Sequence, residues 1–213
     1  MPVLAIGLIA AGNQLTAANM SLYGGNEGLV NLTSGDNNVA VGDQSLADTT
    51  TGSQNTAIGE MSLKSNTTGA GNTALGRFSL YSNTTGGDNV AVGVGALTAN
   101  IEGSQNTAIG SAAGSNNVSG TGNVFIGYMA GSQTSGSNML VIDNSSTNTP
   151  LIYGDFAQDS VTVNGTLNVT GGLNVATMGM DEIVSTTGQR ILSYDQATGA
   201  VHIGQSSMVF YDS

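Results

Sequence analysis

The fold is decided by the stretch Asn72-Thr-Ala-Leu-Gly76, because the same five-residue pattern recurs along the chain at a fixed spacing. Each copy has asparagine, then Val or Thr, then Ala, an aliphatic residue and Gly; only Phe125 breaks the alanine position. The interval is constant at seventeen positions, and the copies begin at Asn38, Asn55, Asn72, Asn89, Asn106 and Asn123. A repeat of this regularity determines the architecture and has to be interpreted first.

Other positions keep the same period. A glycine stands three positions before each asparagine, and the residue eight positions after it is Leu46, Leu63, Leu80, Leu97, Gly114 or Gly131. A repeat of this length is too short for a helix pair or a propeller blade, but it suits one coil of a solenoid. We therefore predict an all-β protein, a parallel β-roll or β-solenoid of six 17-residue coils over residues 35–137.

Alternation along the pentad predicts which side chains enter the roll. We expect the fourth residue of each pentad to point inward beside the leucines. The alanines are then expected on the opposite face, where their small size would let a sister chain approach closely. The predicted roll core comprises Val41, Ile58, Leu75, Val92, Ile109, Ile126, Leu46, Leu63, Leu80 and Leu97.

The repeated asparagines and glycines are predicted to join the coils. Stacked asparagine amides form hydrogen-bonded ladders, and glycine fits tight bends and positive φ angles. The predicted structural ladder comprises Asn38, Asn55, Asn72, Asn89, Asn106, Asn123, Gly42, Gly59, Gly76, Gly93, Gly110 and Gly127.

Composition excludes several classes of protein. The 213 residues include 32 Gly but only 2 Pro, without the G-X-Y period of collagen. Three basic residues against 14 acidic ones give a net charge of −11, so nucleic acid is not an expected partner. The absence of cysteine excludes a disulfide scaffold and a thiolate metal site.

Catalytic chemistry finds little support. His202 is the single histidine, so a nucleophile triad lacks a credible base. The acids of the repeats fall at different repeat positions and single out no glycosidase pair. No phosphate loop or calcium repeat occurs, and the N-x-(S/T) matches at Asn66 and Asn83 are interpreted as turns. We predict no catalytic residue, no cofactor and no metal site.

The N-terminal flank, residues 1–34, is predicted to be an attachment or capping segment. Its apolar run at residues 2–12 is too short to span a bilayer, so membrane insertion is not expected. We interpret the run as a segment buried against a partner or sister chain. A secretion signal is the alternative, although the run lacks a basic n-region.

Two regions follow the repeats. Residues 138–176 are predicted to form a β-strand shaft, with a capping or exit strand from Asn138, a strand at 151–156 and alternating strands over 160–175. Residues 177–213 are predicted to form a C-terminal β-hairpin region. Its strands are expected at 191–194 and 200–203, after a helical turn or linker at 178–184.

The pentads NVAVG, NTAIG and NTALG, together with the NTTG turns at 66–69 and 83–86, resemble the head repeats of YadA-like trimeric autotransporter adhesins. They resemble still more the 17-residue variants in tail fibres of bacteriophages and phage-like particles. The resemblance covers residues 35–131. It implies a left-handed parallel β-roll, an intertwined homotrimer and a role in attachment to surfaces. The thinness of the roll core independently favours association of copies.

These expectations define a structural, non-enzymatic fibre of the virion, placed in its tail, neck or head. Its expected partners are two further copies, particle proteins bound through the N-terminal segment, and a host surface glycan or protein. A bacterial cell-surface adhesin is the alternative, and a polysaccharide-cleaving tailspike is the third choice. The long coiled-coil stalk and anchor barrel typical of the adhesins are not seen in the sequence. In similar fibres a sequence of this kind is followed by a C-terminal chaperone that cleaves itself off. The chain is therefore expected to be either a naturally short fibre or the mature product of such a cleavage.

Overall fold

The computed structural model describes the backbone of residues 6–10, 20–24, 27–168, 170, 183–184, 190–195 and 200–203, and the side chains of 27–168 and 170. The chain divides into two compact units, Met1–Leu167 and Asn168–Ser213. Strands, turns and bends make up these described stretches, and none of them is helical.

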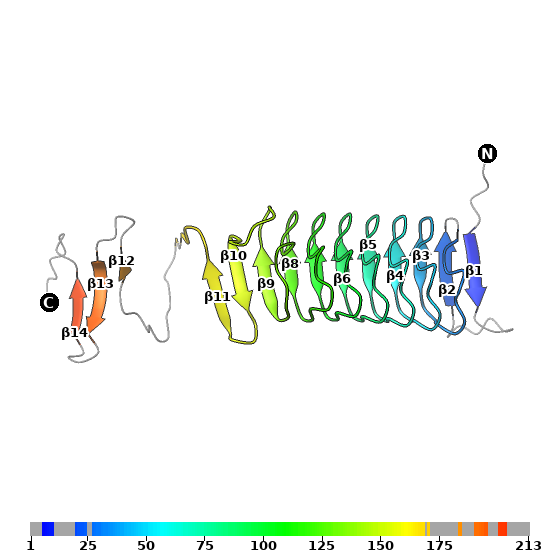
Figure 1. The fold of residues 1–213 in the computed structure, drawn as a ribbon, viewed down its shortest axis with the longest axis horizontal. Coiled ribbons are helices and arrows are strands. Elements are labelled where there is room, and N and C mark those ends of the chain that lie inside the picture. Colours follow the sequence, from blue (N-terminus) through cyan, green and yellow to red (C-terminus); the bar gives the residue numbers. More distant parts are fainter. Residues whose placement is uncertain are drawn as a thin grey trace. The chain divides into compact units, whose positions relative to one another are not determined.

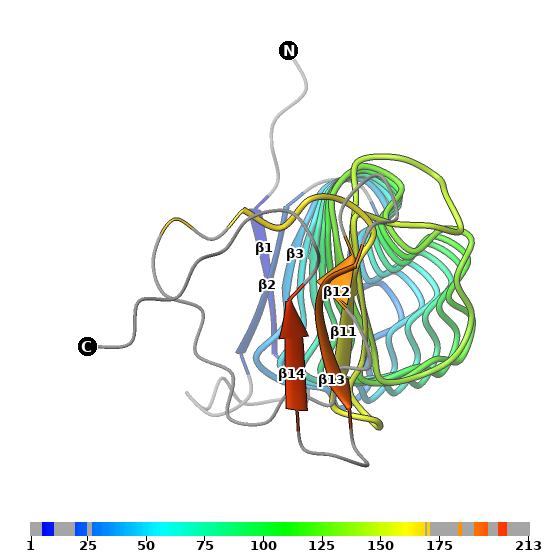
Figure 2. The same cartoon turned by 90° about the vertical axis from the view of Figure 1, so that its left-hand side faces the viewer.

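The first unit is a parallel β-roll. Each pentad forms one short strand that pairs in parallel with the strand of the next coil, which confirms the predicted solenoid. These strands are β3 (Val39–Val41), β4 (Thr56–Ile58), β5 (Thr73–Leu75), β6 (Val90–Val92), β7 (Thr107–Ile109) and β8 (Val124–Ile126). Figure 1 shows the coils stacked side by side, and Figure 2 shows their outlines superposed.

Strands at both ends extend the same sheet, whose order from β1 to β11 follows the chain. Strand β2 (Met20–Gly24) pairs in parallel with β3 and in antiparallel with β1 (Ile6–Ala10). At the other end β9 (Met139–Ile142) is parallel to β8, and β10 (Ile152–Asp155) and β11 (Ser160–Val163) continue in antiparallel.

The exit strand differs in register from the expectation. Leu140 pairs with Val124, an interval one position shorter than the period, so Met139 and not Asn138 takes the asparagine position. Val141 takes the alanine position and is buried. The last coil is therefore shorter than the others by a single residue, and the asparagine column ends there.

The second unit contains a three-stranded antiparallel sheet of β12 (Ile183–Val184), β13 (Arg190–Asp195) and β14 (Ala200–Ile203). The predicted C-terminal hairpin corresponds to β13 and β14. The linker predicted at 178–184 and the later part of the strands predicted at 160–175 lie mostly outside the described residues.

The interior of the roll is lined by the alanine and leucine columns. The fully buried side chains include Ala40, Ala57, Ala74, Ala91, Ala108, Leu46, Leu63, Leu80 and Leu97. The other six of the ten residues predicted for the core are placed wrongly, because the fourth pentad residue points outward. Relative exposures are 37–45% at five of the six positions, and Val92 is half-buried. The six residues concerned are Val41, Ile58, Leu75, Val92, Ile109 and Ile126.

The asparagines explain this inversion. Alternation puts the asparagine and the alanine of each pentad on one face, and a primary amide is buried where other polar groups can satisfy it. The alanine comes inside with the asparagine, while the leucine of the following turn supplies the bulk. The alanine column is therefore unavailable as the close-approach surface predicted for a sister chain.

The leucine column has an unusual backbone. The four leucines adopt left-handed φ angles of 50–52°, a conformation that costs a non-glycine residue about 1–2 kcal/mol. Full burial of a leucine side chain is worth about 1.5–3 kcal/mol and offsets that cost. Gly114 and Gly131 hold the same position with φ angles of 60° and 70°, so the backbone conformation is maintained through the roll.

Phe125 replaces the volume that is missing at these two glycines. An added Cβ at Gly131 would collide with the Phe125 ring, and one at Gly114 would meet both that ring and Leu97. The phenyl ring thus lies where a leucine lies in the earlier coils. The first four coils combine an alanine with a leucine, and the sixth combines Phe125 with Gly131. The fifth coil has two small residues, Ala108 and Gly114, and the Phe125 ring fills the space at Gly114.

This exchange predicts a compensating pair of substitutions. Phe125→Ala should destabilise the roll by about 3–5 kcal/mol through the cavity it leaves, and Gly131→Leu alone should also destabilise it by steric overlap. The double variant rebuilds the alanine–leucine pair of the first four coils in the sixth coil but leaves the space at Gly114 unfilled, so it should recover part of the loss in a denaturant titration. Additive losses in the double variant would contradict the shared-volume interpretation.

Candidate functional site

The predicted asparagine ladder is present and runs along the interior. The side chain of Asn72 donates to Asn55 Oδ1 at 3.2 Å and to the carbonyl of Gly86 at 2.8 Å. Its Oδ1 accepts from the backbone N–H of Asn89 at 3.1 Å and from Asn89 Nδ2 at 3.0 Å. Both donors and both lone pairs of the amide are therefore used. Asn55 and Asn89 repeat the pattern.

A second ladder was missed by the sequence analysis. Asn83 donates to Asn66 Oδ1 at 2.9 Å, and Asn100 donates to Asn83 Oδ1 at 2.8 Å. Asn117 continues the column to Asn100 at 3.2 Å, and all four side chains are buried. The signal was a second asparagine at the same place in four consecutive coils. Their burial also leaves Asn66 and Asn83 inaccessible as glycan acceptors.

Two glycine columns permit the coils to approach. The pentad glycines have φ angles of 115–137°, which side chains rarely adopt, in agreement with the prediction. The glycines three positions before each asparagine meet the next coil directly. An added Cβ at Gly52 would lie 2.5 Å from the carbonyl oxygen of Gly69. These carbonyls are also the acceptors of the ladder amides.

The ladder predicts that one added charge will be poorly tolerated. In Asn72→Asp both amide donors are lost and a buried carboxylate faces the oxygens of Asn55 and Gly86. We expect a loss of about 3–5 kcal/mol at neutral pH. Burial raises the folded-state pKa of the new carboxyl, so the loss should shrink as pH falls toward the unfolded-state value near 4. Denaturant titrations at several pH values measure both effects.

The matched control for that variant is Asn37→Asp, one position before the first ladder residue. Asn37 is exposed with a φ angle of 58°, and Asp88 occupies the same repeat position at 57°. Because the new carboxylate stays in water, this control should change stability by at most about 0.5 kcal/mol. An equal loss in both variants would show that net charge, and not the ladder, sets the effect.

The first coil offers a stabilising substitution. Thr49 holds the second-ladder position there, and its buried Oγ1 has no hydrogen-bond partner. In Thr49→Asn the new amide would reach the carbonyl of Gly52 and accept from Asn66 Nδ2, as its counterparts do in later coils. We expect a gain of about 1 kcal/mol, measured as a higher denaturant midpoint. A loss would mean that the first coil has no room for the amide.

The outer face of the strands is the candidate functional surface. Its two columns are the second pentad residues, which are half-buried, and the exposed aliphatic residues of the fourth position. The second-position column comprises Val39, Thr56, Thr73, Val90, Thr107 and Val124. Neither column contains a charged residue, although the chain carries a net charge of −11. Six coils at a strand spacing of about 4.8 Å make this face roughly 29 Å long.

The side chains that could ligate a metal ion are dispersed over the described residues. No three His, Cys, Asp or Glu residues lie close enough to hold a metal ion within that part of the chain. The side chain of His202, in β14, is not among those described. Asp143 has a structural role instead. Its pKa is lowered, chiefly by the Ser145 hydroxyl at 2.7 Å and then by the Leu151 N–H at 2.7 Å, which together close the loop before β10.

No protein-family model, curated protein or solved structure matches this chain. In the portion that the structure describes, no helix has the length and apolar character needed to cross a bilayer.

Proposed function

We propose that this chain is a structural fibre protein of a bacteriophage or phage-like particle, in which three copies form a rod that attaches the particle to a surface. The observation that supports it best is the uncharged aliphatic outer face of a roll whose interior is already filled. The motif resemblance to phage tail-fibre repeats points in the same direction. The chain has no catalytic role in this proposal.

The outer face supports self-association because it repeats with the coils. Monomeric proteins rarely expose large contiguous apolar patches, and here five of the aliphatic residues are 37–45% exposed. A second copy presents the same columns at the same spacing, so two or three faces match along their whole length. The closed arrangement we propose is a trimer with these faces inward.

The region after the roll adds to this argument. In the β10–β11 hairpin Leu151, Phe156 and Val161 are 53%, 49% and 65% exposed, and Leu167 beyond it is 67% exposed. Strand β11 ends the sheet order, so one of its edges has no described strand partner. Such an edge is protected in native proteins by covering or pairing. We propose that the copies also associate here, as an intertwined shaft.

Particle attachment belongs to the N-terminal segment in this proposal, and surface binding to the roll or the shaft. Antibody labelling of purified particles, viewed by electron microscopy, tests the location. Label on a tail, neck or head appendage is expected. Label confined to a bacterial envelope would favour the cell-surface adhesin instead.

The assembly is tested by native mass measurement. Three chains of 21.2 kDa should give about 64 kDa. The double variant Leu75→Glu, Ile109→Glu should yield a monomer with an unchanged β-sheet spectrum, since burying unpaired carboxylates at a shared face costs several kcal/mol each. A stable wild-type monomer would contradict the proposal.

The matched control is Val118→Glu. Val118 is 49% exposed but lies in a turn outside the two columns. The control should remain trimeric. Dissociation of the control to the same extent would assign the effect to net charge and not to the outer face.

A further inference from the structure

Aromatic and charged side chains gather on the turns that follow the second and third pentads. The second coil contributes Glu60 and Lys64, and the third contributes Arg77, Phe78 and Tyr81. The Phe78 and Tyr81 rings meet edge to face, with their centroids 5.6 Å apart. The Arg77 guanidinium lies 4.1 Å from the centroid of Phe78, and Lys64 Nζ lies 6.0 Å from that of Tyr81. We call this set the coil-three cluster.

The coil-three cluster is not repeated in the other coils. The same three turn positions hold Ser111, Ala112 and Ser115 in the fifth coil, with the same left-handed backbone at Ala112 and Phe78. The roll therefore needs no bulk or charge at these positions. A phenylalanine at a φ angle of 58° costs conformational energy without being fully buried, so folding alone does not account for it.

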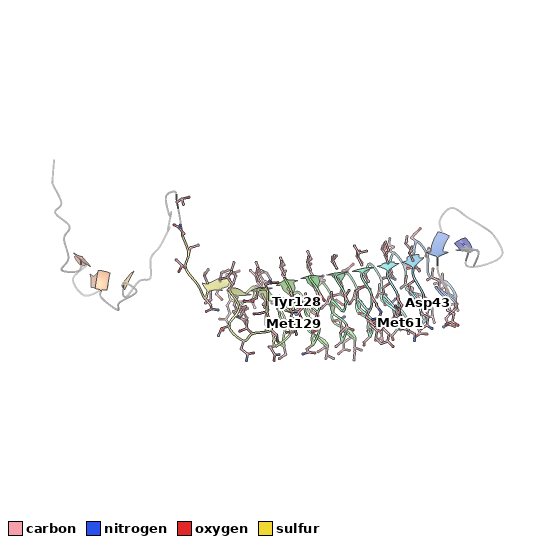
Figure 3. All side chains as sticks on the ribbon, turned by 90° about the horizontal axis from the view of Figure 1, so that it is seen from above. Asp43, Met61, Tyr128 and Met129 are labelled. Atoms are coloured by element: carbon pink, nitrogen blue, oxygen red, sulfur yellow. The ribbon has the colours of Figure 1, made fainter. Side chains whose placement is uncertain are left out.

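The fourth coil has no side chain at Gly95, the position beside Phe78, and this leaves a step in the surface next to the coil-three cluster. Gly95 follows Phe78 in the same column, and an added Cβ there would meet no atom within 4 Å. The neighbouring Thr98 follows Tyr81 and presents a hydroxyl. Figure 3 shows Met61 of this column toward one end of the roll and Met129 toward the other, on the same stretch of turns. The open space at Gly95 is therefore bordered by the exposed side chain of Val94, which follows Arg77, and by the Thr98 hydroxyl.

The polar groups of the cluster are complementary to hydroxyl groups. Glu60 Oε2 accepts from Arg77 Nε at 2.9 Å, and both side chains remain about half exposed, at 44% and 54%. The carboxylate has lone pairs left, and the guanidinium and the Lys64 ammonium have further N–H donors. Lys64 and Arg77 are also the only Lys or Arg side chains that the structure describes.

We infer that the coil-three cluster binds a neutral pyranose of a cell-surface glycan; this rests on the proposed attachment function and gives it a site. The C–H face of a pyranose packs on aromatic rings, and its neighbouring hydroxyls pair with a carboxylate acceptor and cationic donors held side by side. A carboxylated sugar fits less well, because Glu60 stands beside Arg77 and the protein is acidic overall.

Saturation-transfer NMR on the full chain tests the inference, with methyl glycosides of glucose, galactose, mannose and rhamnose as probes. We expect transfer to ring C–H protons of at least one glycoside, with a Kd of about 1 mM or below. No transfer from any neutral probe would overturn the inference. Transfer only with glucuronate or N-acetylneuraminate would overturn it as well, because the ligand class would be acidic.

The variants use residues that the roll already accepts. The triple variant Arg77→Ser, Phe78→Ala, Tyr81→Ser copies the fifth coil, and Gly95→Gln fills the step with the residue found at Gln44. Each should weaken binding roughly tenfold or more while the β-sheet spectrum is kept. Tyr128→Ser removes an aromatic residue that is 52% exposed in the sixth coil and should leave binding unchanged.

Equal binding by the triple variant and the wild type would overturn the site. The same samples are checked by native mass, so the two proposals fail separately. A trimer that binds no glycoside contradicts the glycan site alone. A monomer that binds through the coil-three cluster contradicts the assembly alone.

Discussion

The structure depends on amide groups buried between coils. A single 17-residue coil has too few apolar side chains to order its own backbone, so the coils must be joined by hydrogen bonds that no single coil could make. The asparagine at the start of each strand uses its donors and acceptors on the neighbouring coils and on a glycine carbonyl. Because that amide lies inside, the alanine of the same strand also lies inside, and the leucine of the following turn fills the remaining space. The aliphatic residue at the fourth pentad position then lies outside.

This constraint separates folding from association. In an ordinary globular domain the larger aliphatic residues fill the core, and little apolar surface remains. Here the interior is filled by alanine, leucine and amides, and Ile58, Leu75 and Ile109 remain outside. The interior of the roll is therefore filled without these larger aliphatic side chains. Those side chains are available for contacts with other copies, which is the physical basis of the fibre proposal.

The sequence predicted the period, the parallel strands, the leucine column and the first asparagine ladder, because each is a repeated residue type at a repeated place. The prediction was wrong about which face of each strand points into the roll. Alternation shows that Ala57 and Ile58 lie on opposite sides but not which side is inside, and hydrophobicity alone points to the isoleucine. The second ladder and the relation between Phe125 and Gly131 were also missed, since both depend on contacts between coils that spacing alone does not reveal. The coil-three cluster is not repeated, so a search for regularity passes over it.

The paired solution at Phe125 makes the coils unequal as genetic units. The second and third coils have the same interior residues, so a duplication or deletion of one whole repeat between them would change the roll by one step of about 4.8 Å and keep the same kinds of interior contact. A crossover between the fourth and sixth coils would instead place Phe125 with Leu97, or Ala91 with Gly131, in one coil and would change the contacts of the Phe125 ring. The packing of the second and third coils is therefore compatible with gain or loss of one whole repeat, whereas the fifth and sixth coils depend on each other through Phe125.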